Sequence, residues 1–161
     1  MAADLELIRS EVSSRLPLRT RWLIAGTPLE FDFSRSQRPL KKVYPSDLNG
    51  CDIDKEWTAL YLFGEENFAE GGGARPWLGV HKDTGEIFGL DIERESSVMF
   101  FLNSNITRFV ETFRVFNDAI DLGTVAYTAM ASVARGIDPL SFDRSEWRVL
   151  AGRLSNEDER V

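Results

Sequence analysis

The chain has 161 residues, 43% of them hydrophobic and 11% aromatic, which is the composition of one globular domain rather than a disordered segment. No apolar run is long enough for a transmembrane helix and no signal-peptide pattern opens the sequence, so we expect a cytoplasmic protein. One cysteine and one histidine exclude an internal disulfide and leave too few ligands for a thiolate or histidine metal site. We therefore predict neither a metal nor a cofactor.

The net charge of −7 is concentrated in one segment. Residues 1–46 hold eight Lys or Arg against five Asp or Glu, whereas residues 47–70 hold seven acids against Lys55 alone. Such a surface repels the phosphates of nucleic acid and of anionic lipid, so we expect neither as a partner. It suits a basic protein, because complementary charge speeds encounter. The alternative, that these acids only keep the protein in solution, is equally consistent with the pattern.

The amino-terminal part predicts a helix followed by a strand. Apolar side chains recur three or four positions apart from Leu5 to Leu16, which predicts a helix over residues 3–16 that Pro17 ends. Strict alternation of apolar and acidic residues over 29–33 predicts a strand with one face in solvent.

The next part predicts a strand between two loops. Residues 34–45 are polar and basic with two prolines, which is typical of a loop. The β-prone run 57–63 predicts a strand, and residues 64–75 predict a second loop. That loop contains three consecutive glycines, but no Gly-Lys-Ser/Thr follows, so a flexible connection is favoured over a phosphate-binding loop.

Residues 77–116 predict the centre of the fold. Two apolar runs flank the turn 83–85, whose glycine can adopt the positive φ that closes a hairpin. A third β-prone run, 98–102, predicts the next antiparallel strand, and the polar residues 103–105 suit the start of a helix. That helix has an apolar stripe at helical spacing: Ile106, Phe109, Val110, Phe113 and Phe116.

The carboxyl-terminal part predicts two more helices. An alanine-rich run predicts a helix over 118–134 with Gly136 at its C-cap. Asp143 or Ser145 is expected to cap a short final helix, and residues 155–161 are expected to form a frayed tail. No repeat and no linker divides the chain. We therefore predict a single α+β domain, with a central antiparallel β-sheet and helices packed around it.

No group of side chains has the spacing of a catalytic site, so we do not expect an enzyme. His81 lies in a predicted strand without an orienting partner, and Cys51 is surrounded by acids that disfavour a reactive thiolate. Carboxylate pairs that do not match the spacing of a calcium-binding loop are usually solvated acids on a loop. Two such pairs occur: Asp52 with Asp54, and Glu65 with Glu66.

Several short motifs follow one another in an order known from a protein family. They are Asp-Thr-Gly at 83–85, Leu-Asn-Ser at 102–104, a helix with Phe109 and Phe113, Ile-Asp-Pro at 137–139, and Glu-Trp-x-x-Leu at 146–150. In this order they resemble the SUKH (Smi/Knr-like) superfamily of bacterial toxin-immunity proteins, in particular its fourth subfamily. The resemblance covers residues 57–150, and the first fifty residues only in outline.

The resemblance implies the SUKH fold and a non-enzymatic immunity protein, which binds and neutralises a cognate polymorphic toxin, often a nuclease or deaminase. A nuclease must be basic to hold phosphate, so we expect the acidic segment to bind the toxin. The expected partner-binding residues are Asp47, Asp52, Asp54, Glu56, Glu65, Glu66 and Glu70. Trp57 and Phe68 are candidate anchors, and equally candidate core residues.

Two other functions stay open at this point. The first is a regulatory or scaffolding module that binds a host protein or peptide, as the resemblance also allows. The second is a small-molecule-binding or enzymatic domain, which the missing His, Cys and Ser constellations disfavour. The sequence does not decide between a monomer and a dimer.

Overall fold

The computed structural model describes residues 3–24, 27–43, 59–68, 77–92, 97–121 and 129–159. These residues form an α+β fold, which confirms the predicted class. In chain order the elements are α1 (Leu5–Arg15), β1 (Arg19–Ile24), β2 (Thr27–Asp32), the 3-10 helix η1 (Ser34–Gln37), β3 (Lys41–Lys42), β4 (Leu60–Phe68), β5 (Trp77–His81), β6 (Ile87–Ile92), β7 (Ser97–Asn103), α2 (Ile106–Asp121), α3 (Met130–Ile137), the 3-10 helix η5 (Phe142–Arg144) and α4 (Glu146–Glu159).

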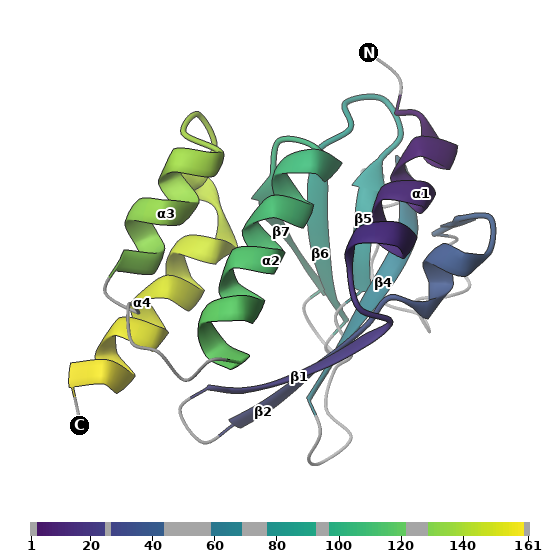
Figure 1. Ribbon diagram of the computed structural model, residues 1–161. Helices are drawn as coiled ribbons and strands as arrows, with labels where there is room; N and C mark the ends of the chain where they lie inside the picture. Colours follow the sequence, from purple (N-terminus) through teal and green to yellow (C-terminus); the bar gives the residue numbers. More distant parts are fainter. Residues whose placement is uncertain are drawn as a thin grey trace.

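The strands form one curled antiparallel sheet in the order β1-β2-β4-β5-β6-β7 (Figure 1). Strand β2 pairs with the second half of β4, where Asp32 lies opposite Glu65. Strand β3 pairs with the first half of β4, where Lys41 lies opposite Leu62. Since β2 and β3 pair with β4 one after the other, η1 lies where the chain passes between these two pairings.

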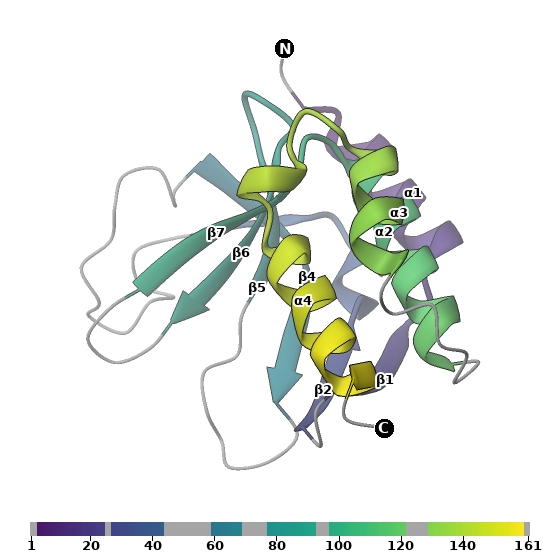
Figure 2. The same ribbon diagram turned by 90° about the vertical axis from the view of Figure 1, so that its left-hand side faces the viewer.

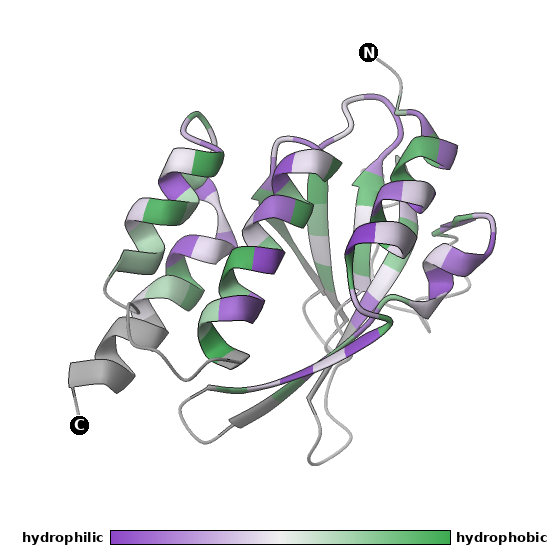
Figure 3. Cartoon of the chain, in the orientation of Figure 1, coloured by the Kyte–Doolittle hydropathy of each residue, from purple (hydrophilic) through white to green (hydrophobic). Residues whose placement is uncertain are grey.

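The helices gather on one side of the sheet. Figures 1 and 2 show α1 and α2 across this face, with α3 and α4 beside α2. Along α2, hydrophilic and hydrophobic residues recur from turn to turn (Figure 3), and the hydrophobic residues three or four positions apart are buried. These buried residues are the apolar stripe predicted from the sequence.

An aromatic core fills the space between the sheet and the helices. Phe113 has no exposed surface, and its ring centroid lies 5.0 Å from that of Trp22, 5.1 Å from that of Phe31 and 5.0 Å from that of Phe33. The rings meet edge-on or stacked, arrangements that add to the stabilisation from burial. A second buried cluster lies apart from this core and consists of Val43, Leu60, Leu62, Phe88, Leu90 and Phe101.

A buried polar network holds the carboxyl-terminal helices to the sheet. At the end of β7, the Asn103 side chain is 2% exposed, and its Oδ1 accepts a hydrogen bond from Trp147 Nε1 at 2.7 Å. Its Nδ2 donates to Thr112 Oγ1 and to Asp138 Oδ2, each at 3.3 Å. Asp138 also accepts from the backbone N–H of Ser104 at 2.8 Å and from its hydroxyl at 2.9 Å. The network therefore joins β7, α2, the turn after α3, and α4.

Several sequence predictions are confirmed in detail. Helix α1, the hairpin between β5 and β6, strand β7 and helix α2 lie where the patterns predicted them. Gly85 adopts φ 75° in the hairpin turn. Asn105 begins α2 as expected, because its Oδ1 accepts the backbone N–H of Arg108 at 2.9 Å.

The loop predicted from Gly64 onwards is wrong over its first residues, because β4 continues to Phe68. The pairing of β4 with β5 shifts register between Leu62 and Gly64, which marks a β-bulge. A Cβ atom at Gly64 would lie 2.8 Å from the ring of Phe33, so glycine permits a close approach here rather than ending the strand.

Other boundaries also differ from the predictions. The predicted loop 34–45 contains η1 and β3. Helix α2 includes residues 118–121, and α3 begins only at Met130, so the single predicted helix over 118–134 is wrong. Gly136 lies inside α3, whose C-cap is Asp138. Helix α4 extends to Glu159, so most of the predicted frayed tail is helical.

Replacing Phe113 by alanine tests the aromatic core. We expect Phe113→Ala to lower the free energy of unfolding by about 3–5 kcal/mol, because a buried ring is lost and a cavity remains. Urea denaturation followed by circular dichroism measures the change, with Val149→Ala at an exposed position of α4 as the control. Equal stability of Phe113→Ala and Val149→Ala would contradict the described core.

Replacing Asn103 by alanine tests the polar network. The change removes the acceptor of the buried Trp147 N–H, which alone costs about 1–3 kcal/mol when a buried donor has no partner. We also expect the near-ultraviolet circular dichroism of the chain to change, because Trp147 loses this partner. Unaltered urea denaturation in Asn103→Ala would show that the network does not stabilise the fold.

Candidate functional site

The register of the sheet places charged side chains in one row across β1, β2 and β4. Arg19 lies opposite Asp32, and Asp32 lies opposite Glu65. Because Phe31 points into the helix-side core, its neighbour Asp32 and this row lie on the other face of the sheet. Two carboxylates directly opposite each other repel, so the row requires neighbouring positive charge.

Two arginines supply that positive charge. Arg19 Nε lies 3.4 Å from Asp32 Oδ2 at one end of the row. At the other end, Arg35 Nε and Nη2 both donate to Glu65 Oε1, at 3.0 and 2.8 Å. The two acids are therefore each held by a different arginine, one from the edge strand β1 and one from η1.

Local hydrogen bonds position η1 over the sheet. Asp32 Oδ1 accepts the backbone N–H of Ser34 at 2.9 Å and its hydroxyl at 2.6 Å, so the end of β2 caps the turn that follows it. Within the turn, the buried Ser36 hydroxyl donates to the carbonyl of Phe33 at 2.7 Å. With Phe33 fixed in the core, the turn presents Arg35 to Glu65.

These contacts change the acidity of Asp32. Partial burial raises the pKa of its carboxyl, but the hydrogen bonds from Ser34 and the positive charges of Arg19 and Arg35 lower it. Together the lowering effects prevail, and the pKa lies below the ordinary value of 3.8. Asp32 is therefore a stably ionised carboxylate at neutral pH rather than a proton donor.

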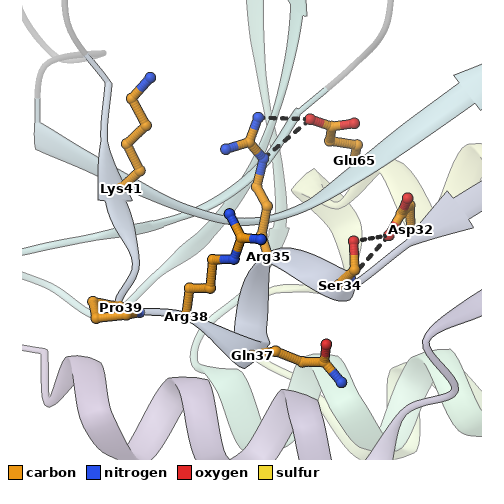
Figure 4. A pocket seen from close by; sticks show the side chains of 8 residues that line it. All are labelled: Asp32, Ser34, Arg35, Gln37, Arg38, Pro39, Lys41 and Glu65. Atoms are coloured by element: carbon orange, nitrogen blue, oxygen red, sulfur yellow. Dashed lines mark hydrogen bonds and ion pairs between the residues drawn. The ribbon is translucent and has the colours of Figure 1, made fainter.

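Beside this row lies an open cavity of about 540 Å³ (Figure 4). Its size is that of a small-ligand or side-chain binding pocket. Polar and charged side chains dominate its lining, which makes it a candidate binding site. The lining residues are Asp32, Ser34, Arg35, Gln37, Arg38, Pro39, Lys41 and Glu65.

The structure places one of the predicted partner-binding acids in this cavity. That residue is Glu65, whose charge is paired with Arg35. Glu66 follows it in β4 and lies opposite Phe31 in the β2–β4 register. The other predicted acids, together with Trp57 and Cys51, lie outside the described residues: Asp47, Asp52, Asp54, Glu56 and Glu70. For all seven acids the partner-binding role stays a prediction.

The cations of the cavity were not singled out by the sequence analysis. Arg35, Arg38 and Lys41 belong to the segment 34–45, which was predicted only as a polar, basic loop. The available signal was that three cations lie close together in this segment. Their position beside β4 could not be predicted, because it depends on the pairing of β3 with β4.

The histidine and the described acids form no further site. His81 lies at the end of β5, and its Nδ1 accepts the backbone N–H groups of Asp83 and Thr84 at 3.1 and 3.3 Å, so it closes the hairpin turn. In the part of the chain that the structure describes, no three His, Cys, Asp or Glu side chains are grouped to hold a metal. No helix in the same part is both long and apolar enough to cross a membrane.

Comparison of the chain with protein-family models, with curated proteins and with solved structures gives no match.

The pH dependence of stability tests the charged row. Because the pKa of Asp32 is lowered on folding, its carboxylate stabilises the fold above the ordinary value of 3.8, and this contribution disappears as the pH falls through the folded pKa. We expect Asp32→Asn to be less stable than the parent at neutral pH, with a difference that shrinks between about pH 5 and about pH 2. Urea denaturation at several pH values measures it. A difference that stays constant across this range, or that appears equally in Asp118→Asn on α2, would contradict the assignment.

Proposed function

We propose that this chain is a non-enzymatic immunity protein of the SUKH type, which acts in the cytoplasm by binding a cognate toxin domain and occluding it. The proposal assigns the chain no chemistry of its own. It requires a rigid scaffold and a surface that recognises one partner.

The observation that carries the proposal is the convergence of the motifs on which the resemblance depends. Leu-Asn-Ser at 102–104, Ile-Asp-Pro at 137–139 and Glu-Trp-x-x-Leu at 146–150 are far apart in the chain. In space, Asn103 bonds to both Asp138 and Trp147. When residues far apart in the chain stabilise a fold together, we expect proteins that share the fold to have the same motifs in the same order. The contacts therefore support the view that the motifs belong together.

The surface opposite the helices is the one that fits partner binding. Its charges are held in place by ion pairs and by the turn η1, so a partner would meet an ordered pattern. An ordered charge pattern favours one partner over others, because like charges that meet across an interface are costly. The chain as a whole has a net charge of −7, which suits a basic toxin.

Capture of the partner tests this proposal. The tagged chain is purified from the producing cell with low-salt and high-salt washes, and bound proteins are identified by mass spectrometry. We expect a basic toxin domain that is retained at low salt, and whose activity the purified chain abolishes at equimolar concentration. Capture of a non-toxin partner, or of a toxin that stays active in the complex, would contradict the proposal.

Charge reversal then tests the acidic surface. We expect Glu65→Lys, Glu66→Lys and Glu70→Lys together to weaken toxin binding by about tenfold or more at low salt, since they replace attraction by repulsion. Asp118→Lys, Asp143→Lys and Glu146→Lys together, at three exposed positions outside β4, are the control matched for net charge. Melting curves establish that the triple variant is folded, because Glu65 also pairs with Arg35. Unchanged affinity would place the interface elsewhere on the chain.

A further inference from the structure

The cavity beside the charged row has more positive than negative charge among its lining residues. Three cations, Arg35, Arg38 and Lys41, face two acids, Asp32 and Glu65. Figure 4 shows the three cationic side chains extending to the same side of the η1 segment, while Gln37 extends the other way. A group that binds beside Arg35 and Arg38 is therefore favoured if it brings negative charge or accepts hydrogen bonds.

The two acids of the cavity are already engaged. Asp32 accepts both hydrogen bonds from Ser34 and pairs with Arg19, which does not line the cavity. Glu65 accepts two hydrogen bonds from Arg35 at one oxygen. A cationic ligand would have to compete with these arginines for the acids. An anionic ligand would leave every one of these contacts in place.

Hydrogen-bond donors remain for such an anion. Arg35 uses Nε and Nη2 for Glu65, and its third nitrogen, Nη1, has no partner in the described part of the chain. The side chain of Arg38 likewise has neither a hydrogen bond nor an ion pair with any residue that the structure describes. Guanidinium groups bind carboxylate and phosphate through two parallel N–H donors, and these pairs are stronger than neutral hydrogen bonds.

We infer that this cavity is a binding site for an oxyanion, a carboxylate or phosphate group, held by Arg38 and by the outward edge of Arg35. Glu65 orients Arg35 for this role by holding its other edge. At about 540 Å³ the cavity has room for more than a lone oxyanion, so a larger ligand with one anionic end also fits. This site does not depend on whether the partner of the chain is a toxin.

Binding of small probes to the purified full chain tests the site. The probes are inorganic phosphate and two blocked tripeptides, Gly-Glu-Gly and Gly-Gln-Gly, each titrated while the backbone amide shifts of residues 34–41 are followed by nuclear magnetic resonance. We expect saturable shifts with phosphate, with the glutamate peptide or with both, and none with the glutamine peptide. Tighter binding of phosphate indicates a phosphorylated ligand, and tighter binding of the glutamate peptide indicates an acidic side chain. Added sodium chloride should weaken either interaction.

Variants of Arg38 assign the binding to the cavity. Arg38→Gln should weaken the affinity for the better probe by about tenfold or more, and Arg38→Lys should lie between the two because it keeps the charge but loses the paired donors. Arg148→Gln, at an exposed position of α4, is the matched control and should bind like the parent. The inference is overturned if no anionic probe gives saturable shifts, if the glutamine peptide gives saturable shifts with the affinity of the glutamate peptide, or if Arg38→Gln and Arg148→Gln behave alike.

Discussion

The fold depends on one side-chain amide. Asn103 ends strand β7, and it offers an acceptor to Trp147 and donors to Thr112 and Asp138. A buried amide is costly unless it is hydrogen-bonded, and here both ends have partners. Because those partners lie on α2, after α3, and on α4, the amide fixes where the carboxyl-terminal helices sit on the sheet. Trp147 in turn contacts the aromatic core, with its ring 4.9 Å from that of Phe116.

This arrangement divides the molecule into a helical side and a charged side. The helices and the aromatic core occupy one face of the sheet near β1 and β2, so that face is not available to a partner. On the other face, Asp32 and Glu65 would repel each other without Arg19 and Arg35. The same ion pairs that stabilise this row also set the direction of Arg35. The proposed recognition by this face would therefore be linked to stability through η1, which is anchored to the core by Phe33.

Local patterns predicted the elements whose periodicity matches their burial, such as the apolar stripe of α2 and the hairpin with Gly85. They failed where long-range contacts decide. Gly64 resembles the start of a loop, yet it lies in a bulged strand because Phe33 needs the space. Two of the partners of Asn103 are 35 and 44 residues away, and Arg35 is 30 residues from Glu65, so no local pattern contains either arrangement in full. The candidate acids could be named from the local composition of the sequence. The ion pair between Glu65 and Arg35 could not be predicted in this way.

The most direct test of this division is hydrogen exchange, measured by mass spectrometry on the chain alone and in complex with the partner recovered from the producing cell. Binding to the charged face should slow exchange in η1, β3 and β4, while α3 and α4 exchange as in the free protein. This result would place the interface on the side opposite the helices. Protection confined to α3 and α4, with η1 and β4 unchanged, would contradict the account and make the helical side the binding surface.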